Sequence, residues 1–282
     1  MVKLFFYGTD KRSEYLKEMY EEQKANIQIV DSVEKAEIVI ISIPFTKDGK
    51  YITGENILIE ELINSCRNKI VITGGIKNAF KSKMEEENIK CVDLMDLDEI
   101  AYLNAIPTAE GAIKCAMDIT PFTIHGANVL ILGFGRVGKI LADKLKGLNA
   151  NVFCEARSKK DLAHIQGLGY NVVELNNITE VIGDMDIIFS TIPAVILDKE
   201  KIKLLSKDTV IIDLASAPGS VDYEACEEYS IKAYLELGIP SKVAPLSAAG
   251  YLKQSIDNII ENEGDKNDSD TSNNFRNSTG DN

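Results

Sequence analysis

Residues 129–138 have the sequence VLILGFGRVG, in which an apolar run meets a G-x-G-x-x-G loop, and this stretch decides the fold class. Apolar residues then recur at helical spacing from Ile140 to Leu148. Between a strand and a helix each glycine has a task. Gly133 makes the tight turn, Gly135 lets the backbone approach a pyrophosphate, and Gly138 lets the helix pack on the strand. The stretch therefore predicts a dinucleotide-binding β-α unit, with phosphates at the helix N-terminus.

Apolar runs alternate with helical stretches throughout the rest of this half of the chain, which is typical of the doubly wound mononucleotide fold. We therefore expect a Rossmann NAD(P)-binding domain at residues 121–262, with Ser247 capping its last helix at 248–260. Its strands are predicted at 128–132, 151–156, 171–175, 185–190, 209–214 and 231–235.

The N-terminal part also alternates apolar runs with helical patterns, which predicts a parallel sheet wrapped by helices. A chain of 282 residues exceeds the ~100–200 residues of one domain, so two domains are expected. The fold class is then α/β with two doubly wound parallel sheets. Residues 1–120 form the first, flavodoxin-like domain, which we expect to serve substrate or partner. Its strands are predicted near 3–7, 27–30, 38–43, 70–73 and 91–94.

Two segments outside the sheets complete the predicted organisation. A linking helix should begin at Thr108 as N-cap, because Pro107 keeps Ile106 out of the α region, and should run to about residue 119. At the other end, residues 263–282 are rich in Asn, Asp, Ser and Gly. They hold too little apolar surface to offset the entropy of ordering, so we expect a disordered acidic tail.

Composition limits the classes of partner. With 44 acidic and 31 basic side chains, the net charge of −13 disfavours nucleic acid and membrane surfaces. No apolar run approaches the ~20 residues of a membrane helix, and no signal-peptide layout opens the chain, so we expect a cytoplasmic protein. The five cysteines lie far apart and lack zinc spacing, so no metal site is expected.

Residues at the end of the second strand of the C-terminal domain determine whether NAD or NADP is bound. An acidic residue there bonds the ribose 2′-hydroxyl, whereas Arg accommodates a 2′-phosphate. The basic cluster after the strand favours NADP, while Glu155 leaves NAD open. Cofactor contacts are expected from the glycine loop, from this segment and from the turn after the fourth strand: Gly133, Phe134, Gly135, Arg136, Val137, Gly138, Arg157, Ser158, Lys159, Thr191, Ile192 and Pro193.

Histidine is scarce, and this limits the chemistry. His125 precedes the first strand of the second domain, at the end remote from the cofactor, and His164 follows Arg157 on a helix. Neither is placed to act as a base near a nicotinamide. A hydroxy-acid dehydrogenase that relies on an imidazole is therefore disfavoured, and a reaction that needs little acid–base assistance fits better.

Several segments occur together: NAIPTAEG at 104–111, TIHG at 123–126, ARS at 156–158, TIP at 191–193, DLAS at 213–216 and GIPSKVAP at 238–245. In this combination the chain resembles the A-subunit family of dipicolinate synthases from spore-forming bacteria. The resemblance is strongest over 104–252 and looser over the first hundred residues. Ser220 and Ser241 stand where the family leads us to expect glycine.

The resemblance implies oxidation of dihydrodipicolinate to the aromatic dipicolinate, with a nicotinamide cofactor accepting the hydride. It also implies a partner, the flavoprotein-like B subunit, in a homo- or hetero-oligomer, and the cytoplasm of the mother cell in a sporulating bacterium. Aromatisation of the ring supplies driving force, so the protein needs mainly to hold the ring carbon against the nicotinamide.

A substrate with two carboxylates should meet cations, hydroxyls and helix N-termini. Glu110 is the candidate proton acceptor, with Thr108 and Ser216 as further catalytic candidates. Thr108 has a competing role as N-cap, and Glu110 a competing role at the helix dipole. Contacts to the substrate are expected from Thr73, Lys77, Asn78, Lys242 and Ser247.

Two other functions stay open at this point. The scarcity of histidine fits equally well a non-catalytic subunit that binds NADP for a structural or regulatory purpose. An amino-acid or hydroxy-acid dehydrogenase of similar layout is the other, and the absent imidazole weakens it.

Overall fold

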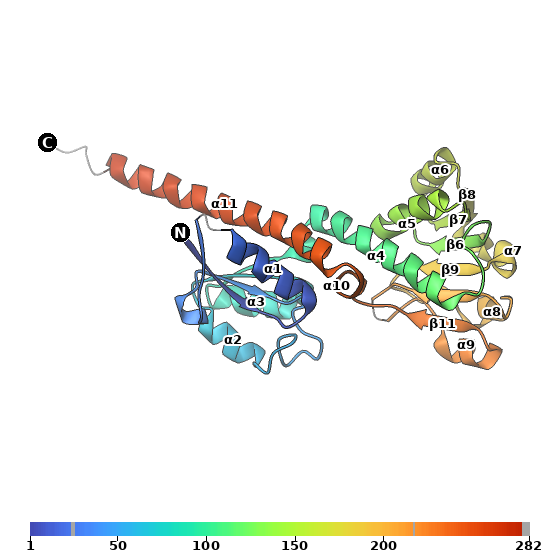
Figure 1. Ribbon diagram of the computed structural model, residues 1–282, viewed down its shortest axis with the longest axis horizontal. Helices are drawn as coiled ribbons and strands as arrows, with labels where there is room; N and C mark the ends of the chain where they lie inside the picture. The colour runs from blue at the N-terminus through green and yellow to red at the C-terminus, as the bar shows by residue number, and fades with distance from the viewer. Residues whose placement is uncertain (24–25, 217, 278–282) are drawn as a thin grey trace. The chain divides into compact units, whose positions relative to one another are not determined.

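The computed structural model describes residues 1–23, 26–216 and 218–277, with side chains described up to residue 263, and it divides into two compact units (Figure 1). Unit 1 consists of Met1–Ala101 together with the chain from Pro245 onward, and unit 2 is Tyr102–Ala244. These boundaries differ from the predicted 1–120 and 121–262. The chain leaves unit 1 inside a helix and returns to it at the start of its last helix.

Unit 1 is built on a five-stranded parallel sheet with the order β2-β1-β3-β4-β5, which confirms the flavodoxin-like prediction. The central strand β3 is buried along its whole length, because helices cover both faces of the sheet. The strands are β1 (Val2–Tyr7), β2 (Ile27–Ile29), β3 (Ile38–Ile41), β4 (Ile70–Thr73) and β5 (Lys90–Asp93), and the helices are α1 (Lys11–Glu22), η1 (Val33–Lys35), α2 (Ile59–Ser65), α3 (Asn78–Glu86) and η2 (Leu94–Asp96).

Unit 2 contains a six-stranded parallel sheet with the order β11-β10-β9-β6-β7-β8, which confirms the predicted Rossmann topology. The strand order reverses between β6 and β9, and the carboxyl ends of these strands mark the expected place for a ligand. The strands are β6 (Asn128–Leu132), β7 (Asn151–Ala156), β8 (Asn171–Glu174), β9 (Ile187–Ser190), β10 (Val210–Asp213) and β11 (Lys232–Leu235).

The helices of unit 2 bury apolar residues on both faces of this sheet. Val129 and Ile131 of β6 pack on one face, and Leu130 and Leu132 on the other, as the alternation of side chains along a strand requires. The helices are α4 (Asp98–Ile119), α5 (Arg136–Gly147), α6 (Lys159–Gly167), η3 (Leu175–Asn177), α7 (Ile178–Val181), η4 (Ile182–Asp184), α8 (Lys199–Ile202), α9 (Tyr223–Tyr229) and α10 (Ile239–Val243).

The linking helix begins earlier than predicted. Helix α4 runs unbroken from Asp98 through Pro107, so the prediction that Thr108 caps its N-terminus is wrong. The Thr108 Oγ1 instead donates to the Asn104 carbonyl at 2.7 Å, one turn back along the helix. The buried alanines of α4, such as Ala109 and Ala112, pack in the core of unit 2, and this packing compensates for the backbone hydrogen bond that Pro107 cannot make.

The last helix, α11 (Pro245–Asn277), belongs to unit 1, and the prediction that it completes the dinucleotide domain is wrong. Leu252 and Ile256 of α11 are buried in a core of unit 1. The Tyr20 hydroxyl of α1 donates to Asp257 at 2.8 Å. The apolar spacing predicted a packed helix but carried no information about which sheet it covers.

Helix α11 begins at Pro245, so Ser247 lies within its first turn and is not its N-cap. The helix continues to Asn277, where composition predicted disorder from residue 263. Extending an existing helix gains one backbone hydrogen bond per residue without a new nucleation step, and this favours helix even in a polar sequence. The predicted tail from 278 to 282 lies outside the described residues.

Candidate dinucleotide site

The glycine loop between β6 and α5 has the geometry that its sequence predicted. Gly133 has φ +93°, and a Cβ added there would meet the Thr191 Oγ1 at 2.6 Å. A Cβ on Gly138 would lie 2.0 Å from the Gly133 carbonyl oxygen, so α5 packs too closely against the loop to leave room for a side chain here. At Gly135 a Cβ would meet no atom within 4 Å, so this backbone faces open space. The loop is therefore a cradle open to a ligand at the N-terminus of α5.

A cavity of about 420 Å³ lies over this cradle. Eight of the twelve residues predicted to contact the cofactor line this cavity. The four that do not are Arg136, Val137, Gly138 and Lys159. Arg136 lies at the start of α5, its guanidinium 5.6 Å from the ring of Tyr102. The lining residues are Gly133, Phe134, Gly135, Glu155, Ala156, Arg157, Ser158, Asp161, Thr191, Ile192 and Pro193.

The two residues that choose between cofactors both line the cavity, but they differ in burial. Glu155 is only 1% exposed, and its Oε2 accepts a hydrogen bond from the Gly133 amide at 3.1 Å. Burial raises the pKa of this carboxyl group. Its Oε1 is buried and has no hydrogen-bond partner among the described residues. Arg157, in contrast, is exposed at the end of β7, followed by Ser158, whose Oγ caps α6 by accepting from the Asp161 amide at 3.0 Å.

Asp213 holds the loop that carries Ser216. This carboxylate at the end of β10 is fully buried. It accepts from the Ala215 amide at 3.0 Å, from the Ser220 amide at 2.9 Å and from the Tyr223 hydroxyl at 3.2 Å. Ser216 is exposed on this loop and does not line the cavity. Sequence reasoning missed Asp213, although an acidic residue ending an apolar strand is a signal that could have found it.

The predicted proton acceptor lies away from the cavity. The Glu110 carboxylate pairs with the Lys144 ammonium at 2.8 Å, and its side chain is 52% exposed. Lys144 lies eight residues beyond the start of α5 at Arg136, which is roughly 12 Å along the helix from the cradle. Neither Glu110 nor Thr108 lines the cavity. The geometry therefore does not support a role for Glu110 at the nicotinamide, and the Thr108 hydroxyl is bonded within its own helix.

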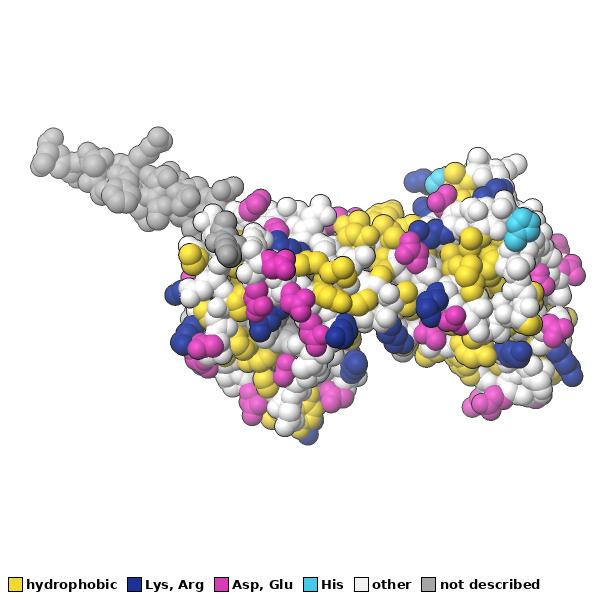
Figure 2. Space-filling model, in the orientation of Figure 1, with side chains coloured by type: hydrophobic (Ala, Val, Ile, Leu, Met, Phe, Trp, Pro, Cys, Tyr) yellow, Lys and Arg dark blue, Asp and Glu magenta, His cyan; other side chains and the backbone are white. Residues whose placement is uncertain are grey.

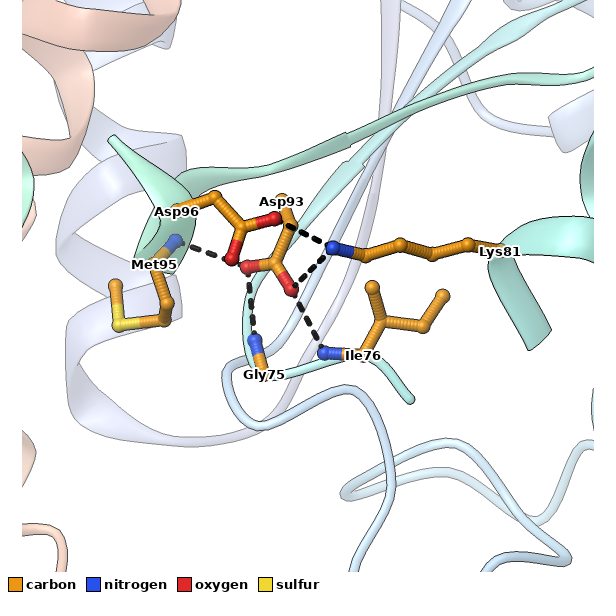
Figure 3. Close-up of polar contacts among 6 residues, drawn as sticks. All are labelled: Gly75, Ile76, Lys81, Asp93, Met95 and Asp96. Carbon is orange, nitrogen blue, oxygen red and sulfur yellow. Dashed lines mark hydrogen bonds and ion pairs between the residues drawn. The ribbon is translucent and has the colours of Figure 1, made fainter. Parts of the chain in front are cut away.

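In unit 1, a second buried carboxylate holds the loop that joins β4 to α3 (Figure 3). Three predicted substrate contacts lie at the end of β4, on this loop and at the start of α3. Asp93 accepts from the Gly75 amide at 2.9 Å and from the Ile76 amide at 3.0 Å, and it lies 3.4 Å from the Lys81 ammonium. Lys77 and Asn78, which follow Ile76, are exposed. Thr73, at the end of β4, is fully buried and donates to the Ser42 carbonyl at 3.1 Å, so its hydroxyl already has a partner.

The two remaining predicted substrate contacts lie on different units. Lys242, on α10 of unit 2, is exposed and lies 3.6 Å from the Glu236 carboxylate. Ser247 is exposed on α11 of unit 1.

On the face shown in Figure 2, Lys and Arg side chains are interspersed with Asp and Glu. Within residues 1–23, 26–216 and 218–277, no group of three His, Cys, Asp or Glu side chains is placed to hold a metal ion. In the same part of the chain, no helix is both long and apolar enough to span a membrane.

Comparison with known proteins agrees with this geometry. Residues 107–228 match the family described as D-isomer specific 2-hydroxyacid dehydrogenase, NAD binding domain. The chain is 36% identical over 207 residues to the A subunit of dipicolinate synthase from Bacillus subtilis, covering 73% of this chain and 70% of that protein. The chain belongs to the A-subunit family of dipicolinate synthases.

Solved structures of this family have the same fold. The crystal structure of the A subunit of dipicolinate synthase from Bacillus halodurans superimposes with a TM-score of 0.83 at 30% identity, covering 92% of this chain and 97% of that one. The corresponding crystal structure from Bacillus subtilis gives a TM-score of 0.84 at 28% identity, covering 94% and 97%. With its NAD-binding domain, this member of the dipicolinate synthase family is an oxidoreductase that uses a nicotinamide dinucleotide.

Proposed function

We propose that this chain is the NADP-dependent subunit that oxidises dihydrodipicolinate to dipicolinate during sporulation, acting on a CH–CH bond. A flavoprotein-like second subunit completes the enzyme in the cytoplasm of the mother cell, as a homo- or hetero-oligomer. The observation that carries the proposal is the open glycine cradle beside Arg157, in a chain 36% identical to the A subunit of dipicolinate synthase from Bacillus subtilis.

The chemistry balances without a further reagent. Dihydrodipicolinate loses a hydride and a proton and becomes the aromatic pyridine dicarboxylate, and NADP⁺ accepts the hydride to become NADPH. The cofactor supplies the hydride acceptor when bound, and the protein supplies binding and orientation. Because aromatisation provides driving force, the proton can leave to water, which agrees with the distance of Glu110 from the cradle.

The cofactor preference is supported by the different burial of two residues that line the cavity. The Glu155 carboxylate is buried and accepts from the Gly133 amide, whereas Arg157 and Ser158 are exposed at the end of β7. A 2′-phosphate placed there meets a cation. NAD would instead place a ribose 2′-hydroxyl near the buried Glu155 Oε1, which has no partner among the described residues.

The deciding experiment uses the full chain with freshly prepared dihydrodipicolinate, with and without the second subunit. Absorbance reports reduced cofactor and dipicolinate separately. Equal amounts of both products, with NADP preferred over NAD, support the proposal. Dipicolinate formed at the same rate without any nicotinamide cofactor would show that the chain only binds the dinucleotide and does not use it as oxidant.

Arg157→Ala tests the cofactor assignment. Removing the guanidinium should raise the KM for NADP by about tenfold or more and leave the KM for NAD within about twofold, because only NADP carries the 2′-phosphate. Steady-state kinetics with each cofactor measure this. Lys207→Ala, which removes an exposed cation just before the amino end of β10, is the matched control. Equal changes for both cofactors would remove the assignment.

Glu110→Gln tests the proton acceptor predicted from sequence. We expect the rate of oxidation to stay within about twofold of the unmodified protein, because the carboxylate is paired with Lys144 at the surface. Exposed ion pairs contribute only about 0.2–1 kcal/mol, so stability should change little. Rates across pH 6–9 are the measurement. A fall of the rate by about tenfold or more, with the affinity for cofactor unchanged, would return Glu110 to the reaction.

A further inference from the structure

Unit 1 contains a buried cation that none of the predicted sites uses. Arg12 is 6% exposed and lies on the same face of α1 as Leu16 and Tyr20, which follow it by one and two helical turns and are also buried. Its Nη2 donates to the Ile43 carbonyl at 2.6 Å. A guanidinium offers five N–H donors and stays charged, so this single carbonyl leaves most of its capacity unused.

No carboxylate within the described residues lies within ion-pair distance of Arg12. Asp10 and Glu14 are the closest acids in sequence, but Glu14 pairs with the Lys11 ammonium at 3.2 Å and Asp10 caps α1. Its Oδ1 accepts from the Arg12 and Ser13 amides at 2.9 and 3.1 Å, and its Oδ2 from the Ser13 hydroxyl at 3.3 Å. Burial lowers the pKa of Arg12 more than the attraction of Asp10 raises it. An uncompensated buried charge destabilises a fold, so stability alone does not account for Arg12.

Arg12 lines a small cavity at the carboxyl ends of β1 and β3. The Ser13 and Ser42 hydroxyls line the same cavity, with their oxygens 3.5 Å apart. Its volume of about 10 Å³ holds one oxygen-sized atom. In the order β2-β1-β3 the chain turns to opposite sides from β1, and ligands of open α/β sheets bind at such a switch point.

We propose that Arg12, with Ser13 and Ser42, binds a carboxylate of a small organic acid at this switch point of unit 1. One carboxylate oxygen enters the cavity and accepts from the guanidinium and a hydroxyl, which neutralises the buried charge. That the acid is a pyridine dicarboxylate rests on the proposed function. A cavity filled by water alone is the contrary outcome.

The test is binding of three acids to the full chain: pyridine-2,6-dicarboxylate, pyridine-2-carboxylate and succinate. Isothermal titration measures the affinities of the unmodified protein, of Arg12→Met and of Arg67→Met. Arg67 is an exposed arginine of unit 1 that pairs with Glu87, and it serves as the matched control. We expect Arg12→Met to lower the affinity for the acid by about tenfold or more. Arg67→Met should leave this affinity unchanged.

Two further measurements separate ligand binding from folding. Affinity for NADPH should be the same in all variants, because the cradle lies in unit 2. Without ligand, Arg12→Met should melt at the same or a higher temperature, since it removes an unpaired buried charge. If Arg12→Met does not fold, Ser42→Ala and Arg12→Lys test the site instead. Both variants should bind the acid more weakly than the unmodified protein does.

The inference is overturned if the unmodified chain binds none of the acids, or if the Arg12 and Ser42 variants bind them as well as it does. If succinate binds in a way that depends on Arg12 and pyridine-2,6-dicarboxylate does not bind, the carboxylate site is supported and the proposed substrate is contradicted. A failure of the site can therefore be distinguished from a failure of the proposed function.

Discussion

Gly138→Ala should reduce the affinity for the nicotinamide dinucleotide on the order of a hundredfold and abolish the oxidation reaction at ordinary cofactor concentration. The added Cβ would lie 2.0 Å from the Gly133 carbonyl oxygen. Neither atom belongs to a flexible side chain, so the loop or α5 must shift as a whole. Amides at the N-terminus of α5 then lose the positions in which they face a pyrophosphate. Titration of the reduced cofactor, followed by its fluorescence, measures the loss.

Gly147→Ala is the matched control for this prediction, since it makes the same change on the same helix. A Cβ there would meet no atom within 4 Å. The variant should bind cofactor normally and melt at an equal or higher temperature, because Ala is the better helix former by about 0.8–1 kcal/mol. Normal binding by Gly138→Ala would mean that the cradle does not hold the dinucleotide.

Asp213→Ala should produce the largest loss of stability in unit 2. The substitution leaves the buried amides of Ala215 and Ser220 without their acceptor. Each unsatisfied buried donor costs about 1–3 kcal/mol, so we expect about 2–6 kcal/mol in total. The loop that carries Ser216 should lose its fixed conformation, and the rate should fall further than the loss of folded protein explains. Thermal unfolding and kinetics on the folded fraction measure the two effects.

Asp208→Ala, an exposed acid before the amino end of β10, is the control and should change neither quantity. Asp213→Asn separates charge from hydrogen bonding, because one amide oxygen can still accept at this position. A melting temperature of Asp213→Ala equal to that of the unmodified chain would contradict the role of this carboxylate in the loop.

Much of the fold could be predicted from sequence because it depends on local patterns. The six strands of unit 2 and the glycine loop follow from apolar runs, turn residues and the spacing of Gly133, Gly135 and Gly138. The structure has each strand within two residues of its predicted bounds. The strand at the centre of unit 1, Ile38–Ile41, was equally clear, since a strand buried on both faces is continuously apolar.

Three of the errors concern what an element packs against or where it begins. Pro107 indicated a helix boundary, but the packing of the neighbouring alanines carries α4 through it. The apolar spacing that includes Leu252 and Ile256 predicted a packed helix, but it did not show that this helix packs against α1. Glu110 was assigned from its place in a predicted first turn, which the longer α4 removes.

Buried charges were the signal that sequence reasoning did not use. Asp93 and Asp213 are each the last residue of a strand. Arg12 lies one helical turn before Leu16, on the buried face of α1. A charged residue in an otherwise apolar pattern either has a partner or serves a ligand. Asp93 and Asp213 have partners, and Arg12 lacks an acidic one within the described residues.

The division of the chain also bears on synthesis. Residues 102–244 form unit 2 as one continuous segment, whereas unit 1 needs α11 from the far end of the chain to cover its sheet. On the ribosome, unit 2 therefore has all of its residues before unit 1 does. The sheet that starts at the N-terminus waits for Leu252 and Ile256, although domains generally fold in the order of synthesis. Until those residues emerge, the apolar face around Leu16 is exposed to chaperones and to other chains.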